Sequence, residues 1–302
     1  MRSSSSSARL AICLILGLTA GCVAPIEART PTGTPRVSSP RVTPPSSSTP
    51  APSATSTEPA ICRSPGRVEN GTYPGVVLQE PIPYRVYLPP CYDPGFGPYP
   101  TLYALHGKPF DDSHWDDLGL DEAAEAGIVA GNWPPFLIVM PYVPEPLLSN
   151  TDGGPGSYEQ ELLEGLIPYI ESGYASDPRP ASRAVTGISR GGVWALEAGL
   201  LHPEVFGSVA ALSPALAVNQ PRPSYNPLEI ASGPGPLPRQ VFLGAGETDW
   251  ARGATERLAG ILGEGGTEVI TLIVPGGHEA RAWEATLRPM LEALMGPGSP
   301  GA

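Results

Sequence analysis

The chain has 302 residues, of which 41% are hydrophobic, and this suffices for one large α/β domain or two small ones. Its formal net charge is −12, with a single lysine, Lys108, and no arginine cluster. Because contact with phosphates requires a basic stripe, nucleic-acid binding is excluded as its main function.

The first 21 residues have the pattern of an export signal. Arg2 and Arg9 flank a serine run, and an apolar segment of about a dozen residues ends in small residues before Cys22, too short to predict a membrane span. "LTAGC" resembles a bacterial lipoprotein box, although Thr19 stands where the usual pattern has leucine. We expect a lipid anchor at Cys22 on the extracellular side of a bacterial membrane. Plain secretion and a retained membrane anchor are the alternatives.

Three further parts of the chain differ in composition. Residues 22–61 are rich in Pro, Ser, Thr and Ala and predict a disordered tether, residues 62–296 predict one catalytic domain, and residues 297–302 are a tail. Because exported proteins favour disulfides, we expect Cys62 and Cys91 to pair, with two free thiols as the alternative. The sequence indicates no oligomeric state.

Short apolar segments alternate with helical ones after Cys62. Ser157 is a candidate N-cap for one of the helices. This alternation predicts a mostly parallel sheet with helices on both faces, in which chemistry collects at the carboxyl ends of the strands. The expected strands are 83–90, 101–107, 135–142, 184–187, 208–214, 239–246 and 267–276, and the expected helices are 119–131, 157–174, one after Ser189, 251–263 and 280–295.

The segment Gly187-Ile188-Ser189-Arg190-Gly191 fits the pattern G-x-S-x-G at a point where a strand ends and a helix begins. Glycines on both sides of Ser189 would remove the steric clash of a sharp turn. The serine hydroxyl would then stand above the sheet edge, so we expect Ser189 to be a nucleophile. The alternative is a glycine-rich turn with an incidental serine.

A serine nucleophile needs a base, and the chain has four histidines. His106 and His114 precede Ser189, whereas the usual order on such a sheet is serine, acid, histidine. His202 ends the helix after Ser189, where capping is its expected role. His278 follows the last predicted strand, next to glycines that leave the loop free to turn, and it is the expected base.

An acid must orient His278, and the loop after residue 246 offers Glu247 and Asp249. We expect Asp249, which lies further into the loop, with Glu247 as the alternative acid. An oxyanion hole would use the backbone amides of Lys108 and Arg190, since the proline after Lys108 has no N–H.

Several segments together resemble the α/β-hydrolases known as the putative esterase family, which includes feruloyl, acetyl-xylan and enterochelin esterases, S-formylglutathione hydrolases and mycolyltransferases. The resemblance covers about residues 80–295. It implies the α/β-hydrolase fold, a triad of Ser189, Asp249 and His278, and an oxyanion hole at Lys108 and Arg190. We expect no cofactor and no metal. Many members carry Met at the position of Arg190. The segments are "YALHGKPFDDSHWDDLGLDEAAEAG", "LIPYIESGYASDPRPASRAVTGISRGGVWAL", "HPEVFGSVAALSPAL", "GAGETD" and "PGGHEARAW".

The expected function is therefore that of an exported serine carboxylic-ester hydrolase that acts on esters of carbohydrates, phenolic acids or siderophores. Acyl transfer to a sugar or lipid acceptor, and a non-catalytic surface binding module, are the alternatives. Residues 111–117 lack the ligand spacing of a zinc site and predict a solvated loop, and the proline-rich segment 219–238 predicts a substrate rim. Trp115, Trp250 and Trp283 would either line a pocket or pack in the core.

Overall fold

The computed structural model describes residues 64–296. The predicted signal segment, Cys22, the tether, Cys62 and the tail lie outside this range. Within it, no helix combines the length and the apolar character that a bilayer crossing requires.

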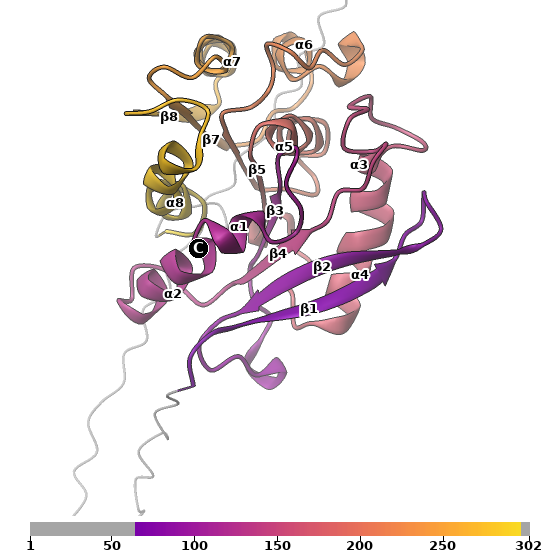
Figure 1. Ribbon diagram of the computed structural model, residues 1–302, viewed down its shortest axis with the longest axis vertical. Helices are drawn as coiled ribbons and strands as arrows, with labels where there is room; N and C mark the ends of the chain where they lie inside the picture. The colour runs from indigo at the N-terminus through magenta and orange to yellow at the C-terminus, as the bar shows by residue number, and fades with distance from the viewer. Residues whose placement is uncertain (1–63, 297–302) are drawn as a thin grey trace, which may run out of the picture. The chain divides into compact units, whose positions relative to one another are not determined.

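A single eight-stranded sheet forms the centre of the described part, with the strand order β1-β2-β4-β3-β5-β6-β7-β8 (Figure 1). The hairpin β1–β2 is antiparallel, β2 is antiparallel to β4, and all the other neighbours are parallel. This mostly parallel sheet confirms the predicted fold class. The strands are β1 (Arg67–Pro74), β2 (Pro81–Leu88), β3 (Thr101–Leu105), β4 (Leu137–Pro141), β5 (Arg183–Gly187), β6 (Ser208–Leu212), β7 (Gln240–Gly246) and β8 (Glu268–Val274).

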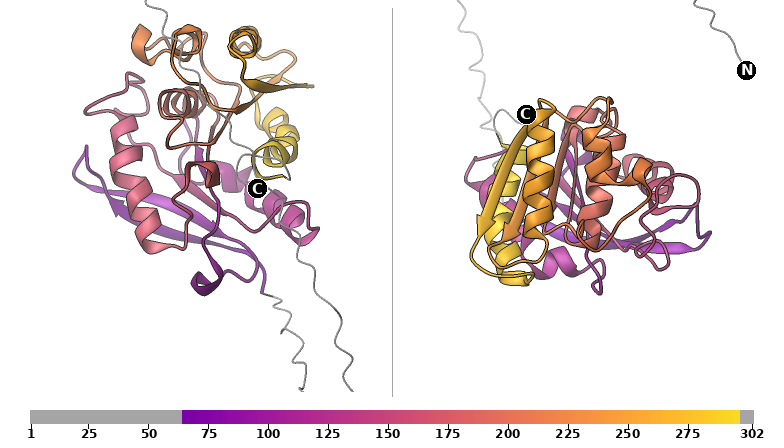
Figure 2. Two further views of the ribbon diagram at one scale, coloured as in Figure 1. Left: turned by 180° about the vertical axis from the view of Figure 1, so that it is seen from behind. Right: turned by 90° about the horizontal axis from the view of Figure 1, so that it is seen from above.

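Helices cover both faces of the sheet (Figure 2). In β3, Leu102 and Ala104 belong to one hydrophobic core, and Tyr103 and Leu105 belong to the other, because successive strand residues point to opposite faces. The first core is covered by α1 (His114–Asp117), α2 (Leu120–Val129) and α8 (Ala280–Met295), and the second by α3 (Tyr158–Gln160), α4 (Ile167–Gly173), α5 (Arg190–Leu201), α6 (Pro227–Ser232) and α7 (Arg252–Glu264).

Three features differ from the sequence prediction. Strand β1 was not predicted, and the predicted helix 157–174 begins at the Ser157 cap but is interrupted by the π-helical turn η2 (Glu161–Leu166) just before Pro168. The predicted solvated loop at 111–117 is wrong, because it contains α1 with His114 and Trp115 buried. The segment 219–238 lies between β6 and β7, and it contains α6 and the 3₁₀ turn η4 (Pro223–Tyr225).

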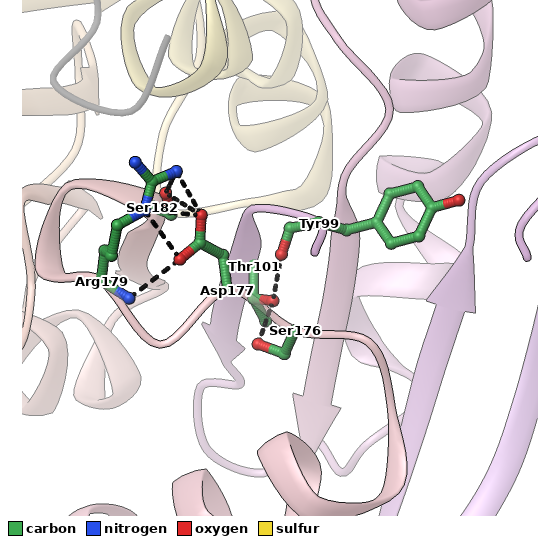
Figure 3. Close-up of polar contacts among 6 residues, drawn as sticks. All are labelled: Tyr99, Thr101, Ser176, Asp177, Arg179 and Ser182. Atoms are coloured by element: carbon green, nitrogen blue, oxygen red, sulfur yellow. Dashed lines mark hydrogen bonds and ion pairs between the residues drawn. The ribbon is translucent and has the colours of Figure 1, made fainter. Parts of the chain in front are cut away.

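A polar cluster ties the loop before β5 to the amino end of β3 (Figure 3). The hydroxyls of Thr101 and Ser176 lie 2.7 Å apart, and the amide of Asp177 donates to the carbonyl of Tyr99 at 2.8 Å. The carboxylate of Asp177 accepts hydrogen bonds from Arg179 and, at 2.8 Å, from the hydroxyl of Ser182. Since Ser189 follows the carboxyl end of β5, this cluster lies at the opposite end of the sheet.

Candidate active site

Ser189 occupies a sharp turn between β5 and α5, with a backbone φ of 54°. A Cβ at Gly187 would stand 2.1 Å from the carbonyl oxygen of Gly191, and a Cβ at Gly191 would stand 2.4 Å from the carbonyl oxygens of Leu105 and His106. Only glycine fits at either position without a shift of the backbone. The G-x-S-x-G pattern is therefore explained by the turn itself.

Three loops bring the predicted triad residues together. Asp249 follows β7 and His278 follows β8. Nε2 of His278 lies 2.9 Å from Oγ of Ser189, and its Nδ1 lies 3.0 and 3.2 Å from the two carboxylate oxygens of Asp249. With the proton on Nδ1 held by Asp249, Nε2 is free to accept the serine proton.

The carboxyl of Asp249 is fully buried. Burial alone would raise its pKa, but hydrogen bonds from His278, from the hydroxyl of Ser213 and from the amide of Ala251 together hold the pKa below its ordinary value. Asp249 is therefore ionised near neutral pH. The alternative acid, Glu247, is exposed, and within residues 64–296 its carboxylate has no hydrogen-bond partner.

Two tryptophans flank the imidazole of His278. The ring of Trp250 lies 4.4 Å from it at 31°, and the ring of Trp283 lies 5.3 Å away and perpendicular. Trp250 is 46% exposed, whereas Trp115 is buried in the core. Of the three tryptophans considered above, Trp250 and Trp283 therefore belong to the site.

His106 anchors the loop after β3. Its Nδ1 lies 2.9 Å from the carbonyl of Gly107, and its Nε2 accepts a hydrogen bond from the amide of Val143 at 2.8 Å. Burial lowers the pKa of His106, so its neutral ring donates through Nδ1 and accepts through Nε2. A Cβ at Gly107 would lie 3.2 Å from Cβ of Ser189, which shows how closely this loop passes the serine. Sequence reasoning missed this anchoring role.

The side chains of Lys108 and Arg190 contact the loop after β4. Nζ of Lys108 lies 2.8 Å from Glu145 and 3.0 Å from the hydroxyl of Ser149. The guanidinium of Arg190 donates to the carbonyl of Ser149 at 2.9 Å and to the side-chain oxygen of Asn219. Since both side chains are engaged there, the backbone amides are the groups that these residues could offer to an oxyanion.

The remaining candidates lie away from Ser189. His202 is the C-cap of α5, as expected, and its amide donates to the carbonyl of Ala198, while its ring contacts the carboxylates of Glu159 and Glu204. Cys91 is disulfide-bonded. Its expected partner, Cys62, lies outside the described residues.

A cleft of about 440 Å³ opens beside Ser189 and His278. Aromatic, acidic and apolar side chains line it. They are Lys108, Pro109, Phe110, His114, Asp117, Leu118, Glu279, Ala280, Trp283 and Glu284.

Comparison with known proteins finds relatives that are named as esterases. A curated endo-1,4-beta-xylanase/feruloyl esterase from Xylanibacter ruminicola is 28% identical over 211 residues, which make up 65% of this chain and 26% of that protein. The chain spans from about a quarter to about half of the length of the curated relatives that it matches.

Solved structures share the fold. A ferulic acid esterase superposes with a TM-score of 0.68 at 21% identity, covering 76% of this chain and 97% of that chain. An S-formylglutathione hydrolase from Staphylococcus aureus superposes with a TM-score of 0.63 at 15% identity, covering 76% and 98%. The family model described as "Putative esterase" matches residues 75–260, which is more than half of the chain. The chain therefore belongs to the "Putative esterase" family and has the α/β-hydrolase fold.

Proposed function

We propose that this protein is a serine carboxylic-ester hydrolase in which Ser189, His278 and Asp249 form the catalytic triad. The observation that carries the proposal is the 2.9 Å contact between Nε2 of His278 and Oγ of Ser189, with Asp249 on the other ring nitrogen. Family membership supports the same reaction class.

In the proposed mechanism, Oγ of Ser189 attacks the ester carbonyl while Nε2 of His278 takes the serine proton. The amides of Lys108 and Arg190 donate to the oxyanion of the tetrahedral intermediate. His278 then gives the proton to the departing alcohol, which leaves an acyl-enzyme. Water, activated by His278, attacks the acyl-enzyme, and the acid leaves as Ser189 regains its proton.

The proposed substrates are esters of carbohydrates, phenolic acids or siderophores. Support comes from a relative whose name includes feruloyl esterase activity, and from the export pattern at the start of the chain. We propose that the chain is exported and carries a lipid anchor at Cys22, which would place the enzyme beside the cell wall. Detection of a diacylglycerol-modified cysteine by mass spectrometry of the membrane fraction tests the anchor.

Labelling with a fluorophosphonate probe tests the triad. We expect the wild type to be labelled, Ser189→Ala to be unlabelled, and Ser172→Ala, which removes an exposed serine of α4, to be labelled like the wild type. Hydrolysis of 4-nitrophenyl acetate should fall by about a thousandfold or more in Ser189→Ala and His278→Ala. An unlabelled wild type, or full labelling of Ser189→Ala, would contradict the proposal.

A further inference from the structure

Aromatic rings form one wall of the cleft beside Ser189. The rings of Phe110 and His114 are stacked 3.8 Å apart at 5°, and the ring of Trp283 stands perpendicular to both, at 6.4 and 5.6 Å. Trp283 also contacts His278, so this wall begins next to the triad. The faces of such rings carry negative electrostatic potential and attract cations.

His114 adds an unused polar group to that wall. His114 is 4% exposed, and its Nδ1 is buried without a hydrogen-bond partner within residues 64–296. Burial lowers the pKa of His114 to about 4, so its ring is neutral near neutral pH. A neutral imidazole has a nitrogen lone pair that accepts hydrogen bonds. The triad does not use this residue, and its unpartnered nitrogen in the wall of the cleft supports a role in binding a polar ligand group.

Three carboxylates also line the cleft. Asp117, Glu279 and Glu284 line it, and in the described part of the chain the carboxylate of Glu284 has no hydrogen-bond partner. The one lysine or arginine among the lining residues is Lys108, whose ammonium is turned to Glu145 at 2.8 Å. The cleft therefore carries an excess of negative charge, on a chain whose formal net charge is −12.

We propose that this cleft is a cation-binding subsite, which takes an ammonium group carried by the ester substrate. This inference rests on the proposed function and deepens it by naming a substrate class: esters with an ammonium a few bonds from the carbonyl. The ring faces and the carboxylates attract any ammonium group, and where that group carries an N–H, the neutral His114 can also accept a hydrogen bond from it. The same carboxylates repel substrates that carry a carboxylate of their own.

Isosteric pairs of esters test the charge preference directly. One pair places the charge on the acyl side: 4-nitrophenyl 4-(trimethylammonio)butyrate against 4-nitrophenyl 5,5-dimethylhexanoate. The other places it on the leaving group: butyrylthiocholine against 3,3-dimethylbutyl thiobutyrate. We expect kcat/KM to favour the cationic member of at least one pair by about tenfold at low ionic strength, and the ratio to fall by several-fold in about 0.5 M NaCl. Ratios of one or less in both pairs would overturn the inference.

Charge-neutralising variants locate the preference. Glu284→Gln and Asp117→Asn should each lower the cationic-to-neutral ratio by about threefold. Glu264→Gln, which makes the same charge change at the last residue of α7, should leave the ratio at the wild-type value. Because the readout is a ratio within each variant, a general loss of activity cancels. An equal effect of all three substitutions would contradict a local subsite.

A binding measurement separates failure of this inference from failure of the proposed function. If the wild type hydrolyses neutral esters without charge preference, the subsite is absent and the esterase function stands. If it hydrolyses no ester, the function fails, and titration of the tryptophan fluorescence of the wild type and of Ser189→Ala decides the subsite. Phenyltrimethylammonium should quench the fluorescence saturably, and benzenesulfonate should bind at least about tenfold more weakly. Equal binding of the two ions, or no binding, would overturn the inference.

Discussion

Nε1 of Trp283 donates a hydrogen bond of 3.0 Å to Oγ of Ser213. Ser213 is fully buried just after β6, at a φ of 48°, and its hydroxyl helps to lower the pKa of the Asp249 carboxyl. Ser213 thus connects the wall of the cleft, through Trp283, to the electrostatic environment of Asp249, which contacts His278. The orientation of the proposed acid therefore depends on a residue outside the triad.

Ser213→Ala should lower kcat for 4-nitrophenyl acetate by about tenfold, the effect expected for loss of one hydrogen bond to a charged group. Without the Ser213 hydroxyl, Asp249 loses a group that lowers its pKa, so its carboxylate stabilises the charged imidazole of His278 more strongly. The acidic side of the kcat–pH profile should therefore shift to a higher pH than in the wild type. Ser213→Gly also lacks the hydroxyl but tolerates the positive φ. Equal effects of the two variants would assign the loss to the hydroxyl, and an unchanged profile in both would contradict the positioning role.

Arg190→Met should destabilise the protein by about 1–3 kcal/mol and raise KM, because it removes the hydrogen bonds that join the loop after β4 at Ser149 to the loop after β6 at Asn219. The control is Arg222→Gln, since Arg222 pairs with Asp152 but its side chain is 65% exposed. Arg222→Gln should lower the free energy of unfolding by less than about 1 kcal/mol. Urea denaturation measures the stability of both variants. An equal loss of stability in the two would contradict the loop-joining role of Arg190.

Much of the fold could be predicted because the parallel strands are apolar and the helices have a clear period. Strand β1 could not, since within Arg67–Pro74 only Tyr73 is buried and the strand exists through its pairing with β2. Helix α1 looked like a solvated loop because four aspartates surround His114 and Trp115. The burial of these two rings decides the structure there, and burial depends on partners that are distant in the chain.

The triad contacts could be predicted because Ser189, Asp249 and His278 each follow a strand, and parallel strands bring their carboxyl ends to one edge. The supporting residues could not be predicted in this way. His106 gains its role from the amide of Val143, and Ser213 gains its role from Trp283, far along the sequence. No local pattern marks either contact.

Glu197→Gln should change how stability depends on pH. Glu197 is fully buried in α5, and its oxygens have no partner within the described range. Burial, with the nearby carboxylates of Glu159 and Asp152, raises its pKa to about 10. An acid whose pKa is raised on folding from about 4.3 makes the protein less stable as the pH rises between the two values. The melting temperature of the wild type should therefore fall, relative to Glu197→Gln, from pH 5 to pH 9. If the melting temperatures of the wild type and Glu197→Gln changed in parallel with pH, this prediction would be contradicted. Glu229→Gln, which alters an exposed carboxyl, is the control, and its melting temperature should follow that of the wild type.

Asp177→Asn should destabilise the protein by about 1–3 kcal/mol at pH 7 without changing kcat, because the Asp177 cluster lies at the end of the sheet opposite Ser189. Hydrogen bonds from Arg179, which outweigh the opposing effect of burial, lower the pKa of Asp177 to about 2, with help from Ser182. A carboxyl whose pKa is lowered on folding contributes stability above its unfolded pKa of about 3.9, and the contribution is lost as the pH falls to about 2. The difference in urea midpoint between the wild type and Asp177→Asn should therefore narrow from pH 5 to pH 2.5. A difference that stays constant over this range would show that the charge of Asp177 contributes nothing.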